Sequence, residues 1–217
     1  MKSRRGGGVA PPQPRPLVWV LAVAAIAVHA MAAEAQVTTT IAPTPGAGAL
    51  GTVVNQAGNS FDITGGTRHA LSDDSSVTIP IGFGFEFFGN SFANVTISSN
   101  GFLAFSSAGS TVYSNTAIPS TSVPNNFVAP FWDDLNPGAG GAVYSLLEGV
   151  APNRRLTVAW VDVPHFSAGG AVSFEAILLE GSNEIIVQYR DVVFGSLGYD
   201  AGGNATVGVE NADGTDG

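Results

Sequence analysis

The residues best placed to do chemistry in this chain are the adjacent carboxylates Asp133 and Asp134, with Asn136 close behind them. They follow the apolar run 127–132 and precede a Pro-Gly pair, so they lie where a strand gives way to a turn. Calcium prefers oxygen ligands, which two carboxylates and an amide carbonyl supply. The same side chains can instead accept hydrogen bonds from loop amides, the commoner role of Asp and Asn in turns. Both interpretations stay open, and calcium is the candidate cofactor.

The sequence offers little support for catalysis. It contains no cysteine, and of its 3 histidines His29 lies in the N-terminal apolar segment. Neither Gly-x-Ser-x-Gly nor His-Glu-x-x-His occurs, so the usual serine-hydrolase and zinc-protease patterns are missing. His165 follows an apolar series and is expected to be a hydrogen-bonded turn residue. Carboxylate pairs of the glycosidase kind are uninformative in so acidic a chain. We therefore expect a protein that is not an enzyme.

The candidate side chains must be positioned by the short runs in which apolar and polar residues alternate. These runs are cut by Gly, Asn, Ser and Pro, and no sustained helical stripe follows the N-terminal segment. The expected strands include 95–98, 102–105, 156–160, 172–178, 185–189 and 207–209. Asn100-Gly101 lies between the first two and predicts a type I′ hairpin. The simplest closed arrangement is an all-β, two-sheet antiparallel β-sandwich.

The alternation also assigns side chains to faces. Trp160 falls in phase with the inward series and is expected in the core, whereas Ser173 and Glu175 are expected to face solvent. Val207 and Val209 are expected to point inward. Phe131 and Trp132 are neighbours, so they should lie on opposite faces of a sheet. Tyr113, Phe166 and Tyr199 fall in expected loops and are candidates for an exposed recognition surface.

The N-terminal region resembles an export signal. Lys2, Arg4, Arg5 and Arg15 precede an apolar run, and Ala33-Glu34-Ala35 fits a small-x-small cleavage pattern, which predicts a signal peptide at 1–35. The alternative, a membrane anchor, suits this run less well because it is short and interrupted by His29. Residues 36–60 are rich in Thr, Pro, Gly and Ala and predict a flexible linker. Residues 61–217 form the expected domain.

Removal of the signal peptide would make the chain strongly acidic. The leader holds four of the 8 basic residues and one of the 17 acidic ones, so four cations would remain against 16 carboxylates. Such a surface repels nucleic acid and anionic membranes and attracts cations such as calcium. We expect a secreted or cell-surface protein with no nucleic-acid partner and no membrane insertion after leader cleavage.

Several segments together resemble a known family. They are 83–90 (FGFEFFGN), 95–102 (VTISSNGF), 129–135 (APFWDDL), 156–160, 172–178, 185–189 and 205–211 (ATVGVEN). Their order is similar to the nidogen-like domain, to its relatives in plexin-domain-containing proteins, and most of all to the variant in bacterial secreted proteins. The resemblance implies an extracellular β-sandwich without catalytic residues. Relatives usually continue beyond the segment matching 208–217, so we also expect a C-terminally truncated domain.

These observations favour a secreted, non-catalytic adhesion, interaction or structural module. Its expected partners are an extracellular protein, a polysaccharide, or neighbouring domains of a larger protein. One alternative is a carbohydrate-binding accessory sandwich assisted by calcium. A secreted hydrolase is the weakest alternative.

Overall fold

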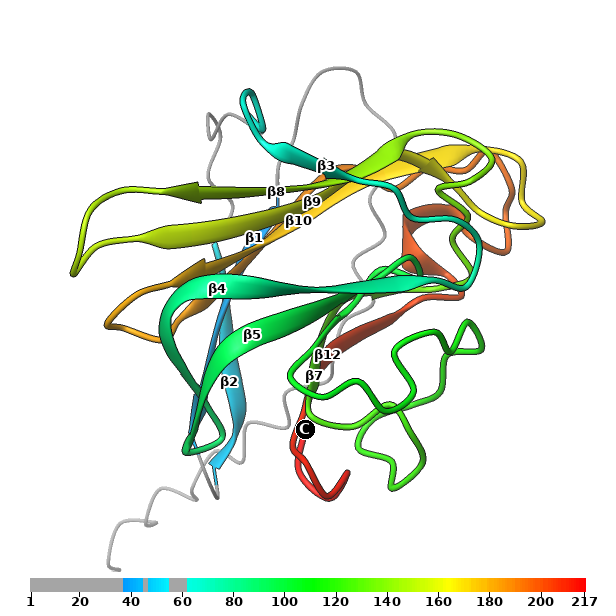
Figure 1. Cartoon of the computed structure of the whole chain (residues 1–217). Coiled ribbons are helices and arrows are strands. Elements are labelled where there is room, and N and C mark those ends of the chain that lie inside the picture. The colour runs from blue at the N-terminus through cyan, green and yellow to red at the C-terminus, as the bar shows by residue number, and fades with distance from the viewer. Residues whose placement is uncertain (1–36, 45–46, 55–61) are drawn as a thin grey trace, which may run out of the picture.

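The protein is an all-β sandwich, as the sequence predicts. The computed structural model describes residues 37–44, 47–54 and 62–217, and its two antiparallel sheets lie face to face (Figure 1). The seven-stranded sheet has the order β2 (Ala47–Val54), β1 (Val37–Thr44), β11 (Ile185–Asp191), β10 (Ala171–Leu179), β9 (Arg155–Pro164), β8 (Ala142–Glu148) and β3 (Thr67–His69). The five-stranded sheet has the order β12 (Thr206–Glu210), β7 (Phe127–Trp132), β6 (Leu103–Ala104), β5 (Asn90–Ser98) and β4 (Ser76–Phe87).

The main hydrophobic core lies between the two sheets, and the inward series predicted from the alternation fill it. Trp160 is fully buried and stacks on Phe174 with ring centroids 4.9 Å apart. Other members of this core are Ile81, Phe85, Ile97, Val128, Phe131, Val158, Ala176, Leu178, Ile185 and Val187. The burial of so many aromatic and branched side chains is the main favourable free-energy term of such a domain.

Two hydrogen bonds join the sheets across this core. The Trp160 indole Nε1 donates to the Ser98 carbonyl oxygen at 3.0 Å, and the Tyr189 hydroxyl donates to the Pro130 carbonyl oxygen at 2.6 Å. Burial raises the pKa of Tyr189, so its hydroxyl keeps the proton that it donates. Each polar tip is thus satisfied inside an apolar layer, as buried Trp and Tyr require.

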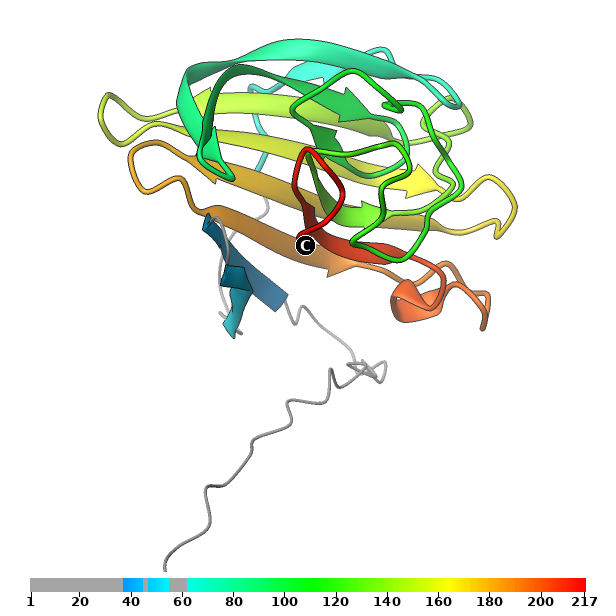
Figure 2. The same ribbon diagram turned by 90° about the horizontal axis from the view of Figure 1, so that it is seen from below.

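A second, smaller core covers the outer face of the five-stranded sheet. The long connection between β6 and β7, green in Figures 1 and 2, lies over this face. Beneath it Trp132 packs against Phe102 and Phe127, while its Nε1 donates to the Val112 carbonyl oxygen at 3.0 Å. Phe131 belongs to the main core. The prediction that Phe131 and Trp132 face opposite sides of the sheet is confirmed.

The hairpin predicted at Asn100-Gly101 forms, but its turn differs from the expected type I′. Thr96 pairs with Ala104 and Ile97 with Leu103, and the Ser98 N–H donates to the Phe102 carbonyl at 3.0 Å. Gly101 has a φ of +78°, whereas Asn100 is not among the residues with positive φ. A type I′ turn needs positive φ at both central positions. The buried Asn100 side chain instead holds together two other loops, described below.

Three predictions of exposure or burial made from the sequence are wrong. Ser173 and Glu175, which were expected to face solvent, are 1% and 3% exposed on the interior strand β10, which pairs with β9 on one side and β11 on the other. Val207 is 52% exposed, whereas Val209 is buried as expected. A register shift in the pairing of β12 with β7, between Thr206 and Gly208, interrupts the simple alternation beside Val207.

The N-terminal region differs in part from the expected linker. β1 pairs antiparallel with β11, and β2 pairs with β1, so a hairpin within 36–60 extends the seven-stranded sheet. The edge of β11 has backbone groups that a further strand can pair, and β-branched residues such as Thr38-Thr39-Thr40 favour an extended chain. The predicted signal peptide at 1–35 lies outside the described residues. Within the described part, no helix has the length and apolar character needed to span a bilayer.

Candidate functional site

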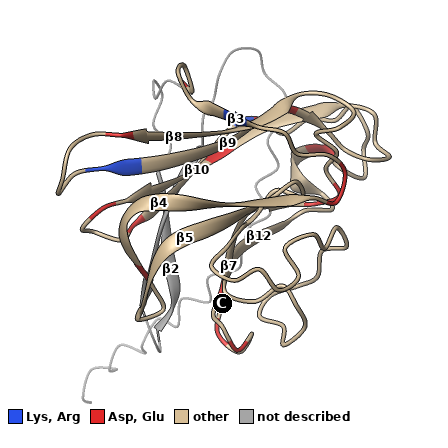
Figure 3. Cartoon of the chain, in the orientation of Figure 1, with Lys and Arg blue, Asp and Glu red and all other residues tan. Residues whose placement is uncertain are grey.

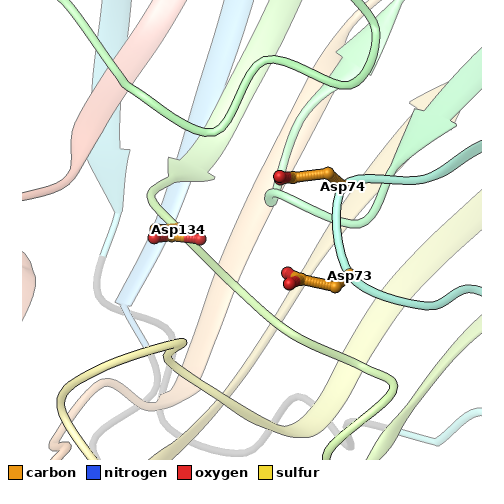
Figure 4. A group of neighbouring side chains, drawn as sticks. All are labelled: Asp73, Asp74 and Asp134. Carbon is orange, nitrogen blue, oxygen red and sulfur yellow. The ribbon is translucent and has the colours of Figure 1, made fainter.

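The carboxylates of Asp73, Asp74 and Asp134 form an acidic cluster at one end of the sandwich. A ligand oxygen from each lies within 4.8 Å of the others. Asp73 and Asp74 come from the loop between β3 and β4, and Asp134 from the loop between β7 and β8. Figure 4 shows Asp73 and Asp74 extending from their loop toward the side on which Asp134 lies. Of the residues predicted to bind calcium, Asp134 is the one found in this cluster.

Asn100 holds the two loops of the acidic cluster in place. Its side-chain Nδ2 donates to Asp74 Oδ1 at 2.9 Å, and its Oδ1 accepts from the Leu135 N–H at 3.0 Å. The side chain is fully buried, so its position is fixed by packing as well as by these bonds. Neighbouring Gly101 permits the close approach, because a Cβ there would lie 1.9 Å from the Phe131 carbonyl oxygen. The turn after β5 therefore positions the cluster.

The three carboxylates repel one another. Burial raises the pKa of Asp134 above its ordinary value; the interaction with His165 lowers this pKa, and the charges of Asp74, Asp73 and Asp133 raise it. Burial also raises the pKa of Asp73, with a second contribution from the charge of Asp74. A bound cation would remove this repulsion, and carboxylate oxygens are the ligands that calcium prefers. Calcium takes 6–8 oxygens, so main-chain carbonyls or water would have to complete a shell begun by these three side chains.

Asp133 has a different position from its neighbour. It is 1% exposed, and its Oδ1 accepts from the Asp134 N–H at 3.0 Å, from His165 Nε2 at 3.3 Å and from Asn204 Nδ2 at 3.4 Å. Its Oδ2 is buried without a hydrogen-bond partner. This arrangement ties the loop after β7 to the loop after β9 and to the segment before β12. Asp133 thus makes the loop hydrogen bonds expected of one interpretation, and the calcium assignment made for Asp133 stays a prediction.

His165 is buried beneath this end of the sandwich. Its Nδ1 accepts from the N–H groups of Ser167 and Ala168 at 2.9 and 3.1 Å, which leaves Nε2 to donate to Asp133. Its ring also contacts that of Tyr199, with centroids 4.4 Å apart. Because both ring nitrogens are engaged in structural hydrogen bonds, the imidazole is not poised to accept a proton from a substrate. The expected turn role of His165 agrees with this geometry.

Asn136 holds its own turn. Its Oδ1 accepts from the Ala139 N–H at 3.1 Å, in the manner of an Asx turn. The turn lies against the loop that carries Asp73 and Asp74. The approach is so close that a Cβ at Gly138 would lie 3.3 Å from Ser72 Cα. The structure therefore places Asn136 beside the cluster as a loop-forming residue, and the calcium assignment made for Asn136 stays a prediction.

Phe166 brings an exposed aromatic ring to the same end. Its N–H donates to the Asp134 carbonyl oxygen at 2.8 Å, and its side chain is 60% exposed. Tyr113 is also exposed, whereas Tyr199 packs partly against the core. We call the loops 70–75, 133–141 and 165–170 together the loop end. It combines three carboxylates with an exposed aromatic side chain.

A second histidine, His69, forms the shorter of the two side-chain Ser–His contacts found in the described part of the chain. His69 Nε2 lies 2.8 Å from Ser145 Oγ, at the edge formed by β3 and β8. Burial lowers the pKa of His69, which keeps the imidazole neutral. Activation of a serine normally needs a third group that orients the histidine. No described acidic side chain hydrogen-bonds the other ring nitrogen of His69, so the pair does not form a triad.

The fold and the loop end define a class of protein: an antiparallel β-sandwich whose candidate binding groups lie on loops at one end of its two sheets. Residues 52–216 match the NIDO-related family, and the chain belongs to that family. The nidogen-like resemblance is thereby confirmed, and membership indicates an extracellular module. No curated protein and no solved structure matches the chain. The relation to plexin-domain-containing proteins and to the bacterial variant stays a prediction.

Proposed function

We propose that this protein is a secreted, non-catalytic interaction module that binds an extracellular protein or polysaccharide through its loop end. The observation that carries the proposal is the juxtaposition of the acidic cluster with exposed Phe166. Binding surfaces combine an exposed aromatic anchor with placed polar groups, and loops on a rigid scaffold commonly present them. The NIDO-related fold supports an extracellular setting.

Calcium is the proposed cofactor of this surface. Three carboxylates held within 4.8 Å by a buried asparagine form a partial oxygen shell before any ligand arrives. Extracellular modules bind calcium with dissociation constants of about 0.1–1 mM, which suits a site with few protein ligands. Calcium would neutralise the cluster and let a polar or anionic partner approach Phe166.

The non-catalytic part of the proposal is supported by the state of the histidines. His165 uses both ring nitrogens within the fold, and the Ser145–His69 pair has no orienting acid among the described residues. Acidic side chains are spread over loops and strand ends, as the red segments of Figure 3 show. This distribution supports the expectation of no nucleic-acid partner.

The proposal is tested by binding of the purified protein to a panel of polysaccharides and matrix proteins, in calcium and in chelator. We expect saturable binding that Phe166→Ala weakens at least tenfold, because an aromatic anchor often contributes more than 1.4 kcal/mol. Val150→Ala is the control, since Val150 is 77% exposed in the turn at the opposite end. If Val150→Ala weakens binding as much as Phe166→Ala does, the loop end is not the binding surface.

A carbohydrate-binding accessory role is the second candidate, and Phe166 is the observation that favours it. Sugars stack on exposed aromatic rings, and Trp132 and Trp160 are too deeply buried to serve this purpose. The same panel separates the two roles. Selective binding to polysaccharides supports the accessory role, whereas selective binding to matrix proteins supports an adhesion module.

A further inference from the structure

A second candidate site lies on a different surface, the outer face of the seven-stranded sheet. A hollow of about 310 Å³ opens there, at the lower end of the range of roughly 300–1,000 Å³ for small-ligand pockets. The strands β8, β9, β10 and β11 form its floor. Its lining includes Asp62, Arg155, Glu175, Ile177, Leu179 and Ile186. The loop end contributes none of these residues.

A buried carboxylate is the unusual feature of this hollow. Glu175 is 3% exposed, and its Oε2 is buried without a hydrogen-bond partner. Glu175 lies on the central strand β10, opposite Ala159 of β9 and Gln188 of β11. Burial of a carboxylate at this position lowers the stability of the fold unless a hydrogen-bond donor or a cation in the hollow pairs with it. Structural stability alone therefore does not account for a glutamate here.

The hollow carries an excess of negative charge. Arg155 pairs with Glu148, with Arg155 Nη2 2.8 Å from Glu148 Oε2, so these two largely offset each other. Asp62 accepts from the Thr64 N–H, and hydrogen bonds to Thr64 lower the pKa of Asp62, which keeps it ionised. Once Arg155 and Glu148 are counted as a neutral pair, the carboxylates of Asp62 and Glu175 give the lining of the hollow its excess negative charge.

The lining of the hollow is mainly polar, with one aliphatic part. Ile177, Leu179 and Ile186 line the hollow beside the carboxyl group of Glu175. An aliphatic strip beside a carboxylate matches a cation carried on a hydrocarbon stem, such as a lysine side chain, which buries its methylenes and extends its ammonium to an acceptor. An anion would be repelled, and a neutral sugar would bring no charge to offset that of the buried carboxylate.

We propose that this hollow binds an alkylammonium group, which donates to the free Oε2 of Glu175 while its hydrocarbon stem lies against Ile177, Leu179 and Ile186. The group is either the lysine side chain of a protein or a free diamine. The site is separate from the proposed function at the loop end, so either can fail without the other.

Protonation of Glu175 gives the site a pH dependence. Burial raises the pKa of Glu175 to about 7, with the charge of Arg155 lowering it and that of Glu148 raising it. Three charged groups surround Glu175 in the hollow: Asp62 before β3, Glu148 on β8 and Arg155 on β9. On the neighbouring strand β11 lie the uncharged Gln188 and, two residues further on, the charged Arg190. An ammonium stays protonated throughout this range. Apparent affinity should therefore fall about 30-fold between pH values of roughly 8 and 5.5.

The test is calorimetric titration of the full chain with three probes: 1,5-diaminopentane, a lysine-containing peptide with blocked ends, and neutral 1-pentanol. We expect both amines to bind at a pH of about 8, pentanol to bind at least tenfold more weakly, and the affinity to fall as acid is added. A tighter peptide identifies a protein lysine as the ligand, and a tighter diamine identifies a free amine. Either result supports the alkylammonium site.

Glu175→Gln keeps the shape of the side chain and removes its charge, so it should weaken amine binding at least tenfold and abolish the pH dependence. Glu86→Gln is the matched control, because Glu86 is exposed on β4 of the other sheet. In the unmodified protein, NMR of the Glu175 carboxyl carbon should show its pKa falling when the diamine saturates the site. Equal binding by the Glu175→Gln variant, equal binding of pentanol, or an unmoved carboxyl pKa would overturn the proposal.

Discussion

At the scale of single residues, neighbours in sequence have different roles. Asp133 is buried and bonds loops together, whereas Asp134 joins the acidic cluster. The sequence identified this acidic pair but not Asp73 and Asp74, because the partners lie about sixty residues away and only the meeting of two loops brings them close. Their one signal was the Ser-Asp-Asp-Ser pattern of a turn. The burial of Glu175 was also missed, since alternation reports a face but not what covers it.

Glu175 makes a prediction about stability. Between pH values of about 4.5 and 7 the folded protein keeps a proton that the unfolded chain has lost, because burial raises the pKa of Glu175 to about 7. The free energy of unfolding should therefore fall as pH rises through this window, by roughly 3 kcal/mol in all. Glu175→Gln removes the penalty and should stabilise the protein by about 1–3 kcal/mol near pH 8, with little effect near pH 5.

Urea denaturation of the Glu175→Gln variant and the unmodified protein at both pH values measures this difference. Glu86→Gln serves as the control and should leave the pH dependence unchanged. If the Glu175→Gln variant and the unmodified protein respond to pH in the same way, Glu175 does not hold a proton in the folded state.

At the scale of elements, the alternation of apolar and polar residues predicted most strands well. It located β9, β10 and β11 through series such as Leu156, Val158 and Trp160, which all reach the core. It could not predict the turn geometry at Asn100, because the position of that side chain depends on its hydrogen bonds to two loops that are distant in sequence. It also could not predict the exposure of Val207, which follows a register shift in the pairing of β12. Long-range contacts, not local preference, decide both features.

Gly101 tests the importance of the turn after β5. Gly101→Ala should destabilise the protein by about 3 kcal/mol or more, because its Cβ would lie 1.9 Å from the Phe131 carbonyl oxygen at a φ of +78°. Gly65→Ala is the matched control: Gly65 has a φ of +82° and nothing within 4 Å of its Cβ, so we expect a cost of only about 1 kcal/mol. Chemical denaturation of both variants compares them, and equal costs would mean that the close contact at Gly101 is not required.

At the scale of the whole molecule, the acidic cluster lies where the two sheets are connected. The loop between β3 and β4 crosses from the seven-stranded to the five-stranded sheet, and the loop between β7 and β8 crosses back. Asn100 bonds both crossings, and Phe166 adds the loop after β9. A cation bound at the cluster would therefore join both sheets and stabilise the domain as a unit.

The most direct measurement of the central claim, that the loop end is the functional site, is thermal unfolding of the chelated protein during titration with calcium. At about one hundred times the dissociation constant, we expect the melting temperature to rise by roughly 5–10 °C. Asp134→Asn should remove the rise and Glu86→Gln should preserve it. A melting temperature that stays constant up to about 10 mM calcium, well above the range of extracellular calcium modules, would contradict the account.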